Sequence, residues 1–206
     1  VGLSVYGNYR IATENSKFAM PETAIGFFPD VGASYFLSRI KNNVGLYLGL
    51  TGDVLFAKEM IFLGIATHYY HSEKLNEIEQ NYINIGSLPK GDRIERKESI
   101  LIENIQFIDE TFQGDIKSIM NKLKKSNFDF AKKTYENLRY RCPTSLAITV
   151  ELYNRAKKLS LKECLEMEFQ LSQKIVYRDD FNNGVEAVLV KKTKNTLWNP
   201  KSIDDI

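Results

Sequence analysis

Two carboxylates stand in an apolar stretch near the start of the chain. Residues 20–30 read MPETAIGFFPD, in which Glu22 and Asp30 each directly follow a proline. One interpretation is structural: each acid caps a turn or a helix start, and Asp30 precedes Val31, where a helical pattern begins. The other is chemical: burial in an apolar pocket raises carboxyl pKa values and suits one acid for general-base or nucleophile chemistry. The spacing alone leaves both interpretations open.

The histidines and cysteines have weaker patterns. His68 and His71 have no Ser or Cys nucleophile with an obvious pairing. Cys142 precedes a proline at an expected helix start, where a thiol pKa falls, but it has no recognisable partner. Cys142 and Cys164 are the only two cysteines and stand far apart. They are interpreted as reduced thiols, and no Cys/His spacing indicates zinc.

A basic cluster follows the last expected helix. Lys191, Lys192 and Lys194 form either a solvated tail or a contact for phosphate groups, because ammonium groups are good point-charge partners for phosphates. The net charge and the length of the apolar runs give no indication of nucleic acid or a membrane as the main partner. A net charge of +2 over 206 residues gives no case for nucleic acid as the main partner. The longest apolar runs are far shorter than the roughly 20 residues that span a membrane.

The first 70 residues alternate short strand and helix patterns, which indicates an α/β layout. We expect strands at 9–13, 18–20 and 66–70. We expect helices over 1–7, 31–40, the run from 44 that ends before Gly52, and 57–63.

The pattern changes after residue 70, so we divide the chain into domains at 1–70 and 71–206. A helix is expected over 72–85, a loop over 87–93 and successive helices over 94–176. Pro143 predicts a helix over 144–159, and Ser160 with Glu163 matches a capping box. Residues 180–184 (DFNNG) indicate a turn, and a last helix is expected over 185–192.

The stretch VGLSVYGNYRIATENSKFAMPETAIGFFPDVGASYFLSRI resembles the crotonase, or enoyl-CoA hydratase/isomerase, superfamily. Residues 21–29 match its PE-x-x-x-G-x-x-P segment, and the resemblance continues through 50–52 and 64–68. Hydratases of this superfamily use two glutamates. Glu22 matches the second, but Gly2 stands where the first is expected. Glycine has no side chain that can act as an acid or a base.

A different branch fits these positions better. MPETAIG-x-FPDVG is similar to the 3-hydroxyisobutyryl-CoA hydrolase branch, as are residues 143–151 and 167–172. Thioester hydrolysis needs a carboxylate that attacks the carbonyl or activates water. The resemblance implies that Glu22 is this group and that Asp30 binds the substrate's 3-hydroxyl or orients water.

The resemblance also implies a fold, a substrate and a compartment. It implies an α/β fold: a partial crotonase-like ββα spiral, then a mainly α-helical C-terminal region. The substrate-binding residues are expected to be Glu22, Asp30, Phe28, Lys191 and Lys192. Coenzyme A enters as part of the acyl-CoA substrate, with no separate cofactor and no metal. Valine breakdown places the branch in mitochondria, with the cytoplasm and peroxisome as alternatives, and relatives of this kind assemble into homo-oligomers.

The superfamily's oxyanion-hole donors lie before the segment that matches Val1. The chain alone is therefore expected to be a C-terminal fragment with weak or no activity, since losing one such donor costs about a hundred- to a thousandfold in rate. Two alternatives stay open at this point. One is hydratase or isomerase activity, and the other is a helical assembly module in which the two acids are only caps.

Overall fold

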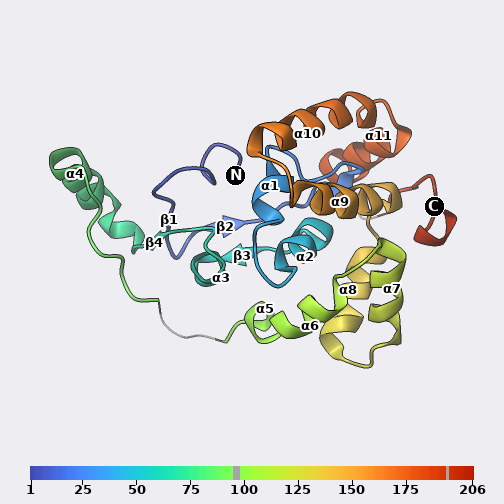
Figure 1. The fold of residues 1–206 in the computed structure, drawn as a ribbon, viewed down its shortest axis with the longest axis horizontal. Coiled ribbons are helices and arrows are strands. Elements are labelled where there is room, and N and C mark those ends of the chain that lie inside the picture. The colour runs from blue at the N-terminus through green and yellow to red at the C-terminus, as the bar shows by residue number, and fades with distance from the viewer. Residues whose placement is uncertain (95–97, 194) are drawn as a thin grey trace. The chain divides into compact units, whose positions relative to one another are not determined.

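The computed structural model describes residues 1–94, 98–193 and 195–206 (Figure 1). By its internal contacts the chain forms two compact units. Unit 1 comprises residues 1–19 and 54–103, and unit 2 comprises residues 20–53 and 104–206. The division at residue 70 that we drew from the sequence stays a prediction.

Unit 1 contains two small sheets beside short helices. Strand β1 pairs in parallel with β4, with Ile11 opposite His68, and β2 pairs antiparallel with β3, with Lys17 opposite Phe56. Its core includes Ala12, Ala57, Ala66 and Tyr69. The elements are β1 (Ile11–Ala12), β2 (Lys17–Phe18), β3 (Leu55–Phe56), α3 (Ala57–Phe62), β4 (His68–Tyr69), the 3₁₀ helix η2 (Ser72–Lys74), α4 (Leu75–Ile85) and α5 (Ile100–Glu103).

Unit 2 is helical and carries the MPETAIGFFPD segment. Its elements are the 3₁₀ helix η1 (Glu22–Ile25), α1 (Ala33–Leu37), α2 (Val44–Thr51), α6 (Ile105–Thr111), α7 (Ile116–Lys125), α8 (Asp129–Arg139), α9 (Pro143–Ala156), α10 (Leu161–Ile175), α11 (Asp179–Val185), the π-helix η3 (Glu186–Val190) and the 3₁₀ helix η4 (Ile203–Asp205). Helix α1 packs against α2, α9 and α10, while α7 and α8 lie side by side (Figure 1).

Local signals explain several of these elements. All eight residues of α2 are buried, as expected for a helix that is apolar on every side. Gly52 ends α2 in a left-handed conformation (φ 65°), and its N–H donates to the Leu48 carbonyl. Pro143 begins α9, and the Ser160–Glu163 capping box begins α10. The expectations for these helix ends are confirmed.

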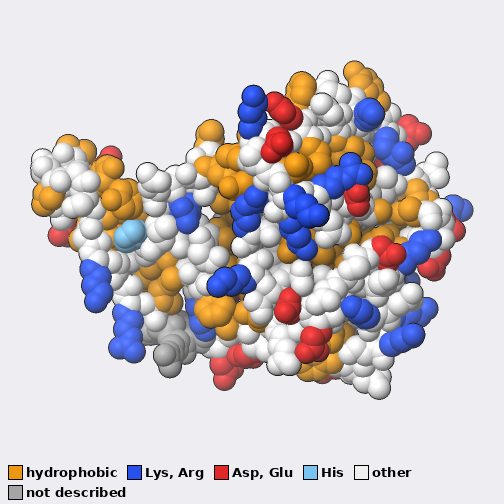
Figure 2. Space-filling view, viewed as in Figure 1, with side chains coloured by type: hydrophobic (Ala, Val, Ile, Leu, Met, Phe, Trp, Pro, Cys, Tyr) orange, Lys and Arg blue, Asp and Glu red, His pale blue; other side chains and the backbone are white. Residues whose placement is uncertain are grey.

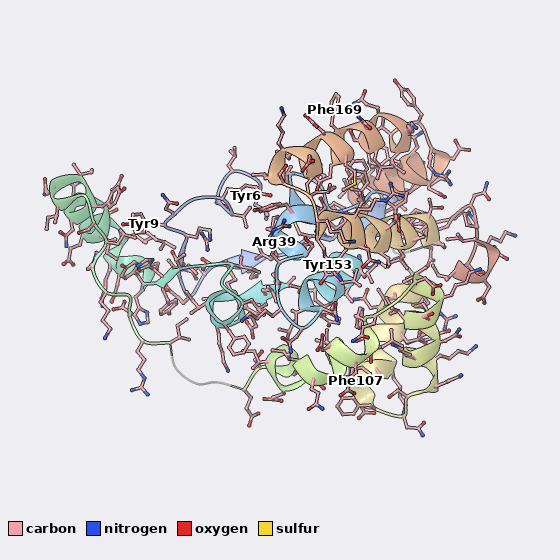
Figure 3. The ribbon with its side chains drawn as sticks, in the orientation of Figure 1. Tyr6, Tyr9, Arg39, Phe107, Tyr153 and Phe169 are labelled. Carbon is pink, nitrogen blue, oxygen red and sulfur yellow. The ribbon has the colours of Figure 1, made fainter. Side chains whose placement is uncertain are left out.

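Arg39 ties the end of α1 to the end of α9. Its guanidinium donates to the carbonyls of Ala156 (3.2 Å) and Leu159 (2.8 Å) and lies 3.5 Å from the centre of the Tyr35 ring. Figure 3 shows Arg39 between these helices. The carbonyls at a helix C-terminus attract cations, so this contact fixes α1 against the larger helix.

Three expectations are wrong. Residues 1–7 form a turn, in which the Val5 N–H donates to the Val1 carbonyl, instead of a helix. Residues 180–184 belong to helix α11 instead of a turn. The helix expected over 185–192 is instead the five-residue π-helix η3 (Glu186–Val190), and the 3₁₀ helix η4 follows it later in the chain. Residues 95–97 of the predicted helical region and Lys194 of the basic cluster lie outside the described residues.

In the part of the chain that the structure describes, none of the helices is long and apolar enough to cross a membrane. Figure 2 shows acidic and basic side chains interspersed on the visible face, consistent with the nearly balanced charge.

Candidate active site

Glu22 begins the 3₁₀ helix η1 and carries the most perturbed carboxyl of the MPETAIGFFPD segment. Its Oε2 atom is buried and makes no hydrogen bond within the described residues. Burial, and to a smaller extent the nearby charge of Asp30, raises the pKa of Glu22 to about 7. A carboxyl that is half ionised near neutral pH, with an unused acceptor oxygen, suits proton transfer or nucleophilic attack.

The backbone around Glu22 is held from several sides. The Thr23 hydroxyl donates to the Leu50 carbonyl (3.0 Å), and the Cys142 N–H donates to the Thr23 carbonyl (3.0 Å). Gly26 closes η1 in a left-handed conformation (φ 74°), and its N–H donates to the Glu22 carbonyl. These bonds connect η1 to the end of α2 and the start of α9, so they fix where the Glu22 side chain begins.

The glycine of the PE-x-x-x-G motif is also needed for space. A Cβ on Gly26 would lie 2.5 Å from the Asp180 carbonyl oxygen, closer than real Cβ contacts. Helix α11 therefore packs directly on the backbone of η1. The left-handed φ and the close approach both require glycine at this position.

Asp30 lies at the other end of the segment, next to an unusual turn. Burial raises the pKa of Asp30. The two residues that follow both have positive φ angles, 55° at Val31 and 83° at Gly32. A left-handed conformation is rare for a β-branched residue such as Val31, and strain of this kind gathers at functional sites.

The two acids are not helix caps. The N-cap residues of η1 and α1 are Pro21 and Gly32, neither of which has a polar side chain. The Asp30 backbone carbonyl accepts from the Ala33 N–H (2.9 Å), and the N-cap of α1 makes no side-chain hydrogen bond. The interpretation of Glu22 and Asp30 as helix N-caps is therefore wrong, while a role in capping a turn stays a prediction.

Glu168 is a third carboxylate at this site, which the sequence did not assign. It is only 3% exposed, on the buried face of α10 four residues after Cys164. Its carboxylate accepts hydrogen bonds from the N–H groups of Gly32 (2.7 Å) and Ser34 (2.9 Å) and from the Ser34 hydroxyl (2.5 Å). The sequence signal that could have identified Glu168 is an acidic residue at a position of α10 that lies on the same helix face as the apolar residues.

Electrostatics join the three carboxylates. The charge of Asp30 raises the pKa of Glu22, and it also adds to the burial that raises the pKa of Glu168. Like charges that lie near one another disfavour the ionised form, so each carboxylate adds to the effect of burial on its neighbour's pKa where the two interact. Among the described residues, no group of three or more His, Cys, Asp and Glu side chains is placed to hold a metal ion.

Phe28 lies between the two acids but faces the core. Its ring is fully buried, stacks on Phe27 with centroids 4.5 Å apart, and packs with Leu152 and Ile175. The ring therefore anchors the segment to α9 and α10. A direct contact between Phe28 and a substrate stays a prediction.

Lys191 and Lys192 follow the π-helix η3. Lys191 Nζ lies 2.8 Å from Glu186 Oε1, and both side chains are exposed. Lys192 has a left-handed backbone (φ 53°). Their contact with phosphate groups stays a prediction.

The two thiols do not compete for the chemistry. Cys142 and Cys164 are both free and buried, which confirms the expectation of reduced thiols. Burial raises the pKa of each thiol, opposite to what an activated nucleophile needs.

The chain is similar to known proteins along its whole length. A model of the enoyl-CoA hydratase/isomerase family matches residues 1–206. The chain is 40% identical to the mitochondrial 3-hydroxyisobutyryl-CoA hydrolase of Xenopus laevis and 41% identical to that of Dictyostelium discoideum. These matches cover 100% of this chain. They cover only 57% and 58% of the length of the two relatives, respectively. The human protein of the same name is 37% identical, with 57% covered.

Solved structures of similar fold carry related names. A carnitinyl-CoA dehydratase from Mycobacterium thermoresistibile superposes with a TM-score of 0.88 and 32% identity, covering 100% of this chain and 60% of that one. An enoyl-CoA hydratase from Rhodobacter sphaeroides gives a TM-score of 0.90 and 27% identity, covering 99% and 60%. The expected α/β fold with a helical C-terminal region is confirmed.

Proposed function

The chain belongs to the enoyl-CoA hydratase/isomerase family, and from this premise we propose that the whole protein hydrolyses the thioester of 3-hydroxyisobutyryl-CoA, or of a similar 3-hydroxyacyl-CoA. The products are the free hydroxy acid and coenzyme A. The observation that carries the proposal is Glu22: an unpaired, buried carboxylate oxygen on a group whose pKa lies at about 7.

Glu22 supplies the attacking oxygen, either directly or through water. In the direct route its carboxylate bonds to the thioester carbonyl carbon, the C–S bond breaks, and the thiolate of coenzyme A leaves and takes up a proton. Water then hydrolyses the resulting anhydride and restores Glu22. In the other route Glu22 takes a proton from the water that attacks the same carbon, the C–S bond breaks, and the proton passes from Glu22 to the departing thiolate of coenzyme A.

Asp30 recognises the hydroxyl of the substrate. Its carboxylate is half-buried and lies close enough to Glu22 for its charge to raise the Glu22 pKa. A partly desolvated carboxylate accepts a hydrogen bond from a 3-hydroxyl group and thereby favours hydroxylated acyl chains.

Several further properties follow from the relatives' names. The curated relatives are named mitochondrial, and we assign the whole protein to the mitochondrion on that ground. The assignment to valine breakdown rests on the resemblance to the hydrolase branch. Coenzyme A enters as part of the acyl-CoA substrate, which is the partner of this site. A homo-oligomeric assembly is part of the same proposal.

The test is release of free thiol from 3-hydroxyisobutyryl-CoA by the whole protein. Glu22→Gln keeps the size of the side chain but removes the base, and we expect the rate to fall about a hundredfold or more. Glu166→Gln, at an exposed position of α10, is the matched control and should leave the rate unchanged. Equal rates for wild type and Glu22→Gln would support the non-catalytic helical module instead.

Hydration is measured in the same preparations. The two solved structures are named for a dehydratase and a hydratase, so a 2-enoyl-CoA is the appropriate second substrate. Gly2 stands where the first hydratase glutamate is expected. Hydration faster than thioester hydrolysis would overturn the proposal.

A further inference from the structure

Glu168 binds the residues that directly follow Asp30. Its side chain lies 136 residues away from Gly32 in the sequence, yet its carboxylate accepts from two backbone N–H groups and one hydroxyl of residues 32–34. Both carboxylate oxygens are used: Oε2 by Gly32, and Oε1 by the N–H and hydroxyl of Ser34. The group is nearly inaccessible to solvent.

The bound residues adjoin a backbone conformation that does not form readily by itself. Val31 has a φ of 55°, and a β-branched side chain is crowded in this left-handed region. Such a conformation persists only when the surrounding structure imposes it. The hydrogen bonds from Gly32 to Glu168 and from Ala33 to the Asp30 carbonyl hold the backbone on both sides of Val31.

A purely structural role for Glu168 explains less of this arrangement. Burying a carboxylate is costly, and a well-packed apolar residue often serves stability equally well. What an apolar residue cannot do is accept N–H groups and so orient one particular turn. The turn that Glu168 orients begins at Asp30, whose charge reaches Glu168.

We propose that Glu168 is a positioning residue: by holding the N–H groups of Gly32 and Ser34 it keeps Val31 left-handed and so sets the direction of the Asp30 carboxylate. The kinetic consequence rests on the proposed function, in which Asp30 recognises the 3-hydroxyl. Glu168 itself touches no substrate.

The kinetic test is a double-mutant cycle in the whole protein with two thioesters, 3-hydroxyisobutyryl-CoA and isobutyryl-CoA. Glu168→Gln should lower kcat/KM for the hydroxylated thioester about tenfold or more and affect the other thioester much less. Adding Glu168→Gln to Asp30→Asn should cost almost nothing more, because both changes remove the same contact. Equal losses on both thioesters, or additive losses in the cycle, would overturn the proposal.

Val31→Gly is the rescue variant. Glycine adopts a positive φ without steric cost, so it lessens the need for Glu168 to impose the turn. In the Glu168→Gln background it should restore at least a few-fold of the lost kcat/KM for the hydroxylated thioester. A protein in which Glu168 only stabilises the fold would recover its activity on both thioesters alike. Glu166→Gln on the same helix is the control and should match wild type on both thioesters.

Backbone amide exchange tests the same contact without catalysis. In Glu168→Gln the amides of Gly32 and Ser34 should exchange faster, while those within α9 keep their protection. Ser34→Ala removes only the hydroxyl bond and should produce a smaller change in the same direction. Unchanged exchange at these amides would overturn the positioning role even if the thioester is hydrolysed. Conversely, a wild type that hydrolyses neither thioester would overturn the proposed function alone.

Discussion

Gly184 of α11 lies against the carbonyl group of Ile25, the last residue of η1. A Cβ on Gly184 would come within 2.4 Å of the Ile25 carbonyl carbon and oxygen. The contact is reciprocal, since Gly26 makes an equally close approach to the Asp180 carbonyl in α11. Two glycines thus allow a helix of the C-terminal region to rest directly on the turn that carries Glu22.

Gly184→Ala should move this turn. The added methyl group cannot fit without displacing η1 or α11, and overpacking of this kind costs roughly 1–3 kcal/mol. We expect a lower denaturation midpoint together with a lower kcat for thioester hydrolysis. Gly86→Ala is the comparison, because Gly86 follows the end of α4 and has open space around it. It should lose some stability through its positive φ and leave kcat unchanged.

The pH dependence of the reaction should report Glu22. Its pKa is raised to about 7, so the charged form that attacks or accepts a proton becomes the major form only above that pH. We expect kcat/KM to rise about tenfold per pH unit below 7 and to level off above it. A profile already flat at pH 5 would show that another group limits the rate.

Asp30→Asn should shift that profile. The charge of Asp30 raises the pKa of Glu22, so removing the charge lowers the pKa. The rising part of the profile should move to lower pH even though the overall rate falls. The position of the curve is the informative quantity, because its height also contains the loss of the substrate contact. A shift toward higher pH would contradict the electrostatic coupling.

The elements that the sequence predicted well are those with local signals. Gly52, Pro143 and the Ser160–Glu163 pair act through their own backbone conformation or a side chain three residues away. Such signals depend little on the rest of the fold. The catalytic role of Glu22 and Asp30 could not be predicted from such local signals. Their spacing left a structural and a chemical interpretation open, and only the family resemblance favoured a catalytic site.

The errors came from tertiary packing. The DFNNG segment has the composition of a turn, but Gly184 is there because α11 must approach η1 closely, and the acids at 179 and 180 suit a helix N-terminus. Glu168 was missed because its partners lie more than 130 residues away. A single sequence does not reveal which backbone N–H groups a distant carboxylate will meet.

Lys191→Ala tests the predicted contact with the phosphates of coenzyme A. Lys191 is exposed and paired with Glu186, so it can exchange this partner for a phosphate at little cost. We expect KM to rise roughly threefold to tenfold with kcat nearly unchanged, and the difference to shrink at high salt as the charges are screened. Lys162→Ala removes a similar exposed lysine and is the control. An unchanged KM would indicate that Lys191 forms only a solvated surface pair.

Glu22→Gln should make the stability of the whole protein less sensitive to alkaline pH. Below the ordinary glutamate pKa of 4.5, Glu22 is protonated in both the folded and unfolded chains. Between pH 4.5 and about 7 the unfolded chain releases this proton while the folded protein keeps it, so the wild type loses stability as the pH rises. A pKa of about 7 instead of 4.5 corresponds to a contribution of at most about 3 kcal/mol to the free energy of unfolding. This contribution is fully lost above pH 7. Gln does not titrate. Denaturant unfolding should therefore show that the free energy of unfolding of the variant rises relative to that of the wild type from pH 5 to pH 8. A constant difference over this range would mean that the folded protein does not raise the Glu22 pKa, and with it the proposed site would lose its principal support.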